Sequence, residues 1–113
     1  MRLEEFNKLV DYIVEDKIKP VMCAKSSEYA RGGDKLYNFK RSAEIDGISP
    51  IEALRGMDLK HRTSISDMLD DVENIQHSRK LWEEKIVDHI NYMLLLYALL
   101  FERYGWEIDN ESI

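Results

Sequence analysis

The longest apolar-periodic segment of the chain begins at Trp82 and runs to about Tyr104. On a helix, at about 100° per residue, one face of its first half carries Ile86, Ile90, Met93 and Tyr97. The opposite face carries Glu84, Asp88 and Asn91, and continues with Leu95 and Leu99. This acidic stripe therefore runs into an apolar half. Two interpretations follow: carboxylates paired with neighbouring Lys or Arg, or a divalent-cation site built on two carboxylates one turn apart.

The N-terminal third shows the same periodicity, broken by proline and glycine. Residues 2–18 carry apolar side chains at spacings of three and four, namely Leu3, Phe6, Val10, Val14 and Ile18, which predicts an amphipathic helix. Pro20 ends or kinks that helix, and it can also open a short helix running toward Tyr29. The Gly32-Gly33 pair then interrupts the chain.

Capping residues delimit the remaining helices. We expect Asp34 to cap a helix that stops at Gly47, and Ser49-Pro50 to open the next one. Ser78 is a candidate cap for the last helix, which Gly105 ends, and Trp106 is expected to fold back onto the bundle from an acidic tail over 106–113. No stretch alternates with period two. The prediction is a single all-α domain over 1–113, a bundle of four main helices plus one short helix.

Two polar residues interrupt the apolar stripe of the central helix. The stripe consists of Ile51, Leu54, Met57, Ile65 and Met68. Asp58 and His61 lie on it as i,i+3 neighbours, close enough to hydrogen-bond to each other. A histidine on an apolar face is more often a satisfied core residue than a catalyst, with Asp58 as its expected partner.

Composition and charge indicate which kinds of binding partner and which cellular compartment to expect. A chain of 113 residues with a net charge of −6 is one domain without general affinity for nucleic-acid backbone or anionic membrane. Its most apolar run, 92–101, is about half the length that spans a bilayer, and no signal peptide is visible. The single Cys23 excludes an intramolecular disulfide, so a reducing compartment, the cytoplasm, is expected.

The region from Lys25 to Asn38 combines cations, the glycine pair and a helix start. Such a loop can present backbone N–H groups and a helix dipole to a phosphate. The glycines can equally serve only to turn the chain, and Asp34 at the cap would oppose an anion while helping to hold a cation. Lys60 lies at the edge of the central stripe, where its long stem can carry an ammonium to an acidic pocket, although a surface lysine is the commoner explanation.

Four short motifs occur in a fixed order: Lys25-x-x-x-Tyr29, Asp34-x-x-x-Asn38-Phe39, Leu59-Lys60 and Glu84-x-x-x-Asp88-x-x-x-Tyr92. Over about residues 20–101 they resemble a phage and prophage branch of the all-α nucleotide pyrophosphohydrolases, the MazG-like and dimeric-dUTPase-like group. Glu84 and Asp88 match one of the two metal-binding motifs of that group, whereas the other has no clean counterpart. Ala30 and Asn91 stand where the family pattern has glycine.

This resemblance implies Mg²⁺-dependent cleavage of a nucleoside triphosphate to the monophosphate and pyrophosphate, in the cytoplasm of a bacterial host cell. It implies these roles: metal ligands Glu84, Asp88 and Asp34; phosphate contacts Lys25, Arg31 and Lys60; catalytic roles for Lys60 and Asn38; base stacking by Tyr29 or Tyr37. A homo-oligomer is expected as well, because so short a chain encloses a nucleotide poorly.

A second hypothesis keeps the same fold without catalysis. The bundle then binds or sequesters a nucleotide, or acts as a phage accessory protein that binds a host protein. Only Glu84 and Asp88 are convincingly placed as metal ligands, and a Mg²⁺ enzyme of this kind needs more than two acids from one helix.

Overall fold

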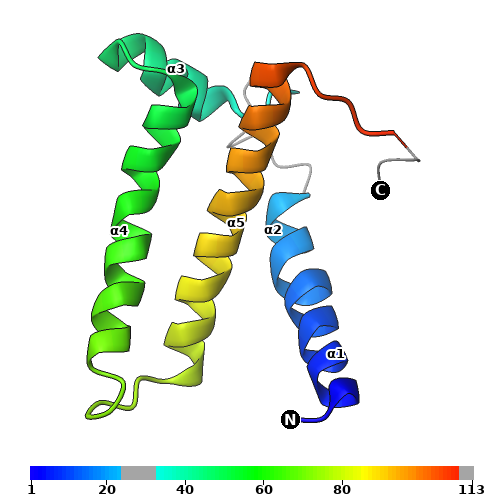
Figure 1. Ribbon diagram of the computed structural model, residues 1–113, viewed down its shortest axis with the longest axis vertical. Helices are drawn as coiled ribbons and strands as arrows, with labels where there is room; N and C mark the ends of the chain where they lie inside the picture. Colours follow the sequence, from blue (N-terminus) through cyan, green and yellow to red (C-terminus); the bar gives the residue numbers. More distant parts are fainter. Residues whose placement is uncertain (24–32, 110–113) are drawn as a thin grey trace.

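The computed structural model describes residues 1–23 and 33–109, and these residues form helices and no strand. The elements in chain order are α1 (Leu3–Asp11), η1 (Tyr12–Ile18), α2 (Lys19–Met22), α3 (Tyr37–Asp46), α4 (Pro50–Asp70) and α5 (Arg79–Tyr104) (Figure 1). The predicted all-α fold class is confirmed. No described helix combines the length and the apolarity that crossing a membrane requires.

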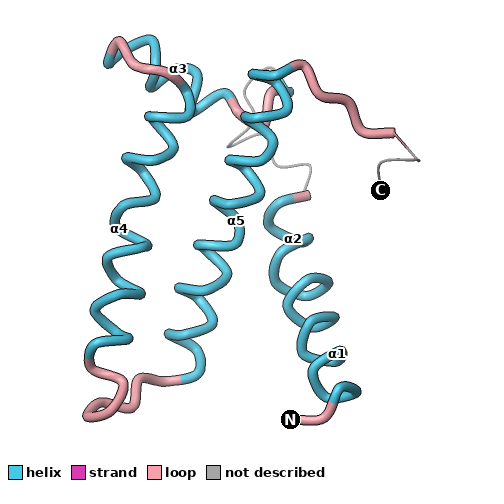
Figure 2. The backbone as a smooth tube through the Cα atoms, viewed as in Figure 1, coloured by secondary structure: helices cyan, strands magenta, loops and turns pink. Residues whose placement is uncertain are grey.

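The first three elements form one N-terminal helical arm (Figure 2). α1 passes into η1, a π-helical stretch, and η1 passes into α2 with the junction residues in right-handed helical geometry. Pro20 lies in the first turn of α2, where its missing N–H costs least. Of the expected outcomes at Pro20, the opening of a short helix is therefore the one observed; its predicted continuation beyond Cys23 to Tyr29 lies outside the described residues.

The ends of the longer helices follow the capping signals. Ser49 Oγ accepts a hydrogen bond from the Glu52 N–H, and Ser78 Oγ accepts one from the Leu81 N–H, each at 3.1 Å. Gly47 and Gly105 end α3 and α5 with φ of 69° and 66°, a left-handed geometry that favours glycine. Local chemistry therefore sets these boundaries, as predicted.

The prediction that Asp34 is the N-cap of α3 is wrong by two residues, because Leu36 occupies that position. Asp34 instead folds a turn ahead of the helix, where its Oδ1 accepts the Leu36 N–H at 2.9 Å and its Oδ2 pairs with Lys40 Nζ at 2.7 Å. An aspartate bonding a backbone N–H two residues on competes with the capping geometry. Lys40 also pairs with Glu102 at 2.9 Å and so ties the start of α3 to the end of α5.

α4 and α5 lie side by side in opposite directions, α3 crosses one end of α4, and the arm flanks α5 (Figure 1). The core lies where α3, α4 and α5 meet: Leu36, Phe39, Leu54 and Leu99 are buried there. Partly buried neighbours, among them Met57, Tyr92 and Leu95, extend it along α5. At the C-terminal end of α5, Trp106 packs its ring on Phe101 and Tyr104, which confirms the predicted fold-back.

Candidate ligand pocket

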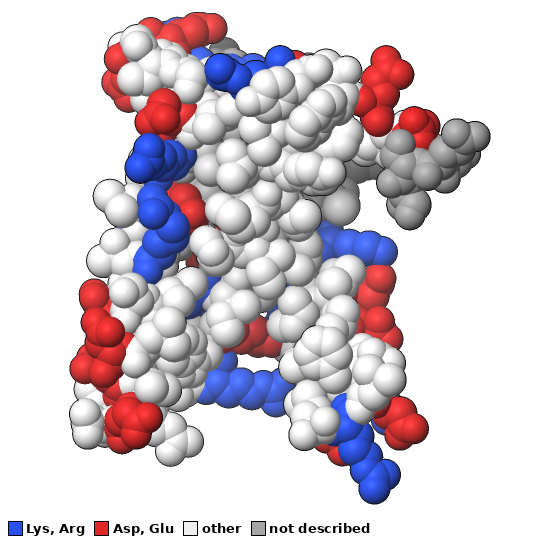
Figure 3. All heavy atoms as spheres, viewed as in Figure 1, with Lys and Arg blue, Asp and Glu red and all other residues white. Residues whose placement is uncertain are grey.

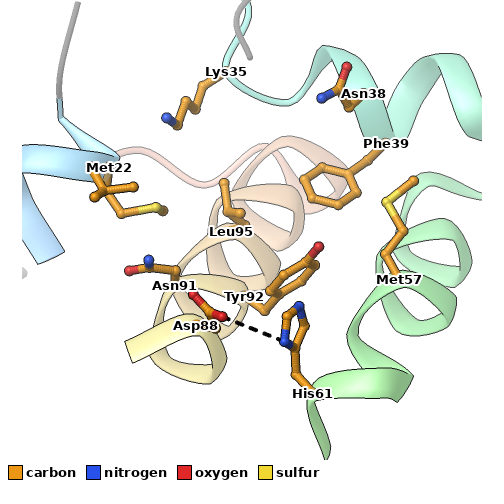
Figure 4. A pocket seen from close by; sticks show the side chains of 11 residues that line it. Met22, Lys35, Asn38, Phe39, Met57, His61, Asp88, Asn91, Tyr92 and Leu95 are labelled. Carbon is orange, nitrogen blue, oxygen red and sulfur yellow. Dashed lines mark ion pairs between the residues drawn. The ribbon is translucent and has the colours of Figure 1, made fainter. Parts of the chain in front are cut away.

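A pocket of about 310 Å³ opens beside this core, where α2, the start of α3, α4 and α5 converge; we call it the central pocket (Figure 4). Its apolar wall consists of Val21, Met22, Phe39, Met57 and Leu95, with the ring of Tyr92. Its polar side chains are Lys35, Asn38, His61, Asp88 and Asn91. The volume lies at the lower end of the range for small-molecule sites, roughly 300–1,000 Å³.

Aromatic rings shape the inner end of the pocket. Phe39 and Tyr92 meet edge to face with their centroids 6.3 Å apart, and the His61 ring lies 4.9 Å from the Tyr92 ring. Burial raises the pKa of the Tyr92 hydroxyl, and the nearby carboxylates of Asp58 and Asp88 raise it further. Tyr92 therefore presents a neutral O–H at physiological pH, able both to donate and to accept a hydrogen bond.

Two Asp–His pairs join α4 to α5 at this level. His61 Nδ1 of α4 lies 3.8 Å from Asp88 Oδ2 of α5, at the edge of the central pocket (Figure 4). Deeper in the core, His89 Nδ1 of α5 lies 3.6 Å from Asp58 Oδ2 of α4, which Arg62 Nε also approaches to 3.5 Å. The expected pairing of Asp58 with His61 is wrong, because each of them pairs with a residue of α5 instead. The register of α4 against α5 places Asp58 opposite His89 and His61 opposite Asp88.

The pairs differ in burial. The Asp58 side chain is only 2% exposed, while Asp88 is 40% exposed and faces the pocket. Asp58 Oδ1 and His89 Nδ1 are enclosed and make no hydrogen bond within the described structure. Neither residue lines the central pocket, so this pair is not a ligand group of that pocket. The Asp88–His61 pair is reachable from the pocket and can exchange a proton or a hydrogen bond with a ligand.

The carboxamide of Asn91 is a further polar group at the pocket wall. Its Oδ1 is enclosed and has no hydrogen-bond partner among the described residues. An enclosed acceptor without a donor costs about 1–3 kcal/mol. Because this oxygen is enclosed, the Asn91 side chain contributes to the pocket wall through its other atoms.

The structure brings together only part of the residues that the sequence singled out. Asn38 and Asp88 line the central pocket. Glu84 and Lys60 are exposed and lie outside its wall, Tyr37 begins α3 without lining it, and Asp34 is engaged by Lys40. Lys25, Tyr29 and Arg31 lie outside the described residues.

The expected magnesium ligands do not form one site. Within residues 1–23 and 33–109, no group of three or more His, Cys, Asp or Glu side chains lies close enough together to hold a metal ion. Glu84, Asp88 and Asp34 therefore do not converge. Lys40 and the Leu36 N–H hold the pKa of Asp34 below its usual value, which marks it as half of an ion pair.

Lys35, Asn91 and His61 are pocket residues to which the sequence analysis gave no ligand role. Lys35 lies three residues before Asn38, so the two share one side at the start of α3; that spacing was the available signal. Asn91 shared the predicted acidic face with Asp88. His61 was noticeable as a polar residue on an apolar stripe, but its partner on α5 had no signal in the local sequence.

No protein-family model, curated protein or solved structure matches the chain. The likeness to nucleotide pyrophosphohydrolases thus stays a prediction from four short motifs.

Proposed function

We propose that the protein binds a small ligand carrying a nucleobase and an anionic group, a nucleotide, in the central pocket. The observation that carries this proposal is the combination of groups at one place: aromatic and thioether side chains, two carboxamides and one lysine around about 310 Å³. Flat rings pack well on Phe39 and Tyr92, and Met22 and Met57 adapt to their outline.

The polar groups suit the two ends of such a ligand. The carboxamide of Asn38 offers a donor and an acceptor, the set that a base edge requires. Lys35 extends from the turn before α3 over the opening between Met22 and Leu95, where its ammonium can meet a phosphate (Figure 4). The volume suits a base with its sugar, so the phosphates would project toward the mouth of the pocket. This ligand class agrees with the reducing cytoplasm that Cys23 predicts.

Binding is tested by calorimetry of the whole chain with a panel of nucleosides, nucleotides and nucleoside triphosphates, with and without Mg²⁺. At least one nucleotide should bind, and Lys35→Ala should weaken it roughly 10- to 100-fold through loss of a charge-assisted hydrogen bond. Lys60→Ala is the matched control, because Lys60 is exposed outside the pocket and its removal should leave the affinity unchanged.

A panel that gives no binding heat and no rise in melting temperature would refute the proposal. If Lys60→Ala weakened nucleotide binding while Lys35→Ala left the affinity unchanged, the proposal would also be contradicted. That result would favour the phosphate contacts that the family resemblance implies.

Hydrolysis of the bound nucleotide is a second candidate, favoured by the Asp88–His61 pair at the pocket wall. This activity requires the nucleotide to bind the other way round, with its phosphates toward His61 instead of Lys35. His61, oriented by Asp88, is then suited to take a proton from a water that attacks the α-phosphorus as the bond to the pyrophosphate group breaks. Pyrophosphate release that is lost in both His61→Ala and Asp88→Asn, but kept in Glu84→Gln, would establish this activity. Binding without release leaves the sequestering function.

A further inference from the structure

α5 carries a second apolar stripe on the side turned away from the central pocket, which we call the outer stripe. It consists of Ile86, Ile90, Met93, Tyr97, Leu100 and Tyr104, at alternating spacings of four and three residues. This alternation is the heptad pattern with which one helix packs along another in a left-handed coiled coil. A single helix thus has two apolar sides: one for its own core, and one whose register suits a further helix.

The outer stripe is not buried within the chain. Met93 is 39% exposed, Ile86 45%, Tyr97 56% and Tyr104 58%. Ile90, Met93, Tyr97 and Leu100, with Leu94 beside them, line an open groove of about 440 Å³ along α5. Figure 3 shows a broad area without Lys, Arg, Asp or Glu over the centre of this face of the molecule. A contiguous apolar surface of this kind is typical of a protein–protein contact.

α1 is uncovered in the same way. Its apolar side chains Leu3, Phe6 and Val10 recur at helical spacing, yet α1 contains no buried residue and these three are 41–73% exposed. An amphipathic helix is stabilised mainly by burying its apolar face, so within the described part of the chain α1 lacks the contact that its sequence is patterned for.

The size of the chain leads to the same conclusion. Its accessible surface is 8886 Å², whereas a compact monomer of 13.4 kDa exposes roughly 6,500 Å². Its radius of gyration is 16.5 Å, against about 13 Å for a compact chain of 113 residues. The excess surface, about 2,400 Å², exceeds the roughly 800 Å² that each partner contributes to a standard interface.

We propose that two copies of this chain form a homodimer through the outer stripe, with α5 packed against α5 of the second copy about a two-fold axis. A second copy is the occupant because a heptad helix is complementary to itself, so one symmetric contact covers both stripes. The six residues of the stripe include no Asp, Glu, Lys or Arg. Two chains of net charge −6 can therefore meet there without placing like charges against each other. The exposed face of α1 is a further apolar surface that a second copy can cover.

The interface lies on the opposite side of α5 from Asp88 and Asn91, so it does not depend on the proposed nucleotide binding. Sedimentation or light scattering of the full chain without ligand should give twice 13.4 kDa. Met93→Glu should raise the dimer dissociation constant at least ~100-fold, because it places an unpaired carboxylate in an apolar contact. Its mass should therefore fall to that of one chain at concentrations where the wild type is dimeric.

Leu59→Glu is the matched control, since Leu59 of α4 is 55% exposed and outside the outer stripe; its mass should remain twice that of the chain. Far-ultraviolet circular dichroism checks that each variant remains helical. A wild-type mass of one chain overturns the proposal even where Met93→Glu fails to fold. An oligomer that Leu59→Glu dissociates while Met93→Glu leaves it intact overturns it as well.

Discussion

Asp58 of α4 and His89 of α5 face each other across the helix pair, with 3.6 Å between Asp58 Oδ2 and His89 Nδ1. Asp88 of α5 and His61 of α4 repeat the arrangement in the reverse sense, 3.8 Å apart. Each helix therefore supplies one acid and one histidine to its neighbour. Because the Asp58 carboxylate is buried while Asp88 opens on the pocket, we expect the first pair to serve stability and the second to serve ligand binding.

Asp58→Ala should lower the free energy of unfolding by about 2–3 kcal/mol, because it leaves Arg62 and His89 without their carboxylate partner and opens a cavity between the helices. Urea unfolding followed by circular dichroism measures the change. Asp67→Ala, an exposed acid of the same helix, should stay within about 0.5 kcal/mol. Equal stability of the two variants would show that the buried pair contributes nothing.

Substituting alanine for either of two glycines with open space around them should change the stability of the protein in opposite directions. A Cβ added at Gly47 or at Gly56 meets no atom within 4 Å. Gly47 has a φ of 69°, so Gly47→Ala should destabilise by about 1 kcal/mol through backbone strain. Gly56 lies within α4, so Gly56→Ala should stabilise by about 0.5–1 kcal/mol through helix propensity. Thermal melts should show a lower melting temperature for Gly47→Ala and a higher one for Gly56→Ala. Melting temperatures that shift in the same direction would contradict this prediction.

Asp34 should make stability depend on pH in the acid range. The hydrogen bond from Lys40 and the Leu36 N–H lower the pKa of Asp34 from its usual 3.8, so the charged carboxylate favours the folded state. That contribution is present above pH 3.8 and is lost as the pH falls through the lower folded pKa. Since the side chain is 36% exposed, Asp34→Asn should cost no more than about 1 kcal/mol at pH 7.

The difference between wild type and Asp34→Asn should shrink when urea unfolding is repeated at pH values below 3.8. Asp67→Asn serves as the control, and should show no comparable change with pH. A difference for Asp34→Asn that stays constant down to the acid limit would mean that the ion pair with Lys40 does not form in solution.

The fold was largely predictable because its signals act over a few residues. Ser49 and Ser78 cap their helices through side chains three residues from the N–H groups they accept, and Gly47 and Gly105 end helices by their own backbone geometry. Asp34 was misplaced because an aspartate can satisfy a backbone N–H equally well from a turn before the helix. Of the site residues predicted within the described chain, only Asn38 and Asp88 line the central pocket, and the roles predicted for them stay predictions.

The Trp82–Tyr104 segment illustrates both parts of the result. Its sequence alone determined a long helix with Asp88 and Asn91 on one face and Ile86, Ile90 and Met93 on the other, because helical periodicity fixes which side chains share a side. Only the tertiary structure decided what those faces meet. The packing register of α4 against α5 set Asp88 opposite His61 and left Glu84 outside the pocket, since such pairings depend on contacts between residues far apart in the chain.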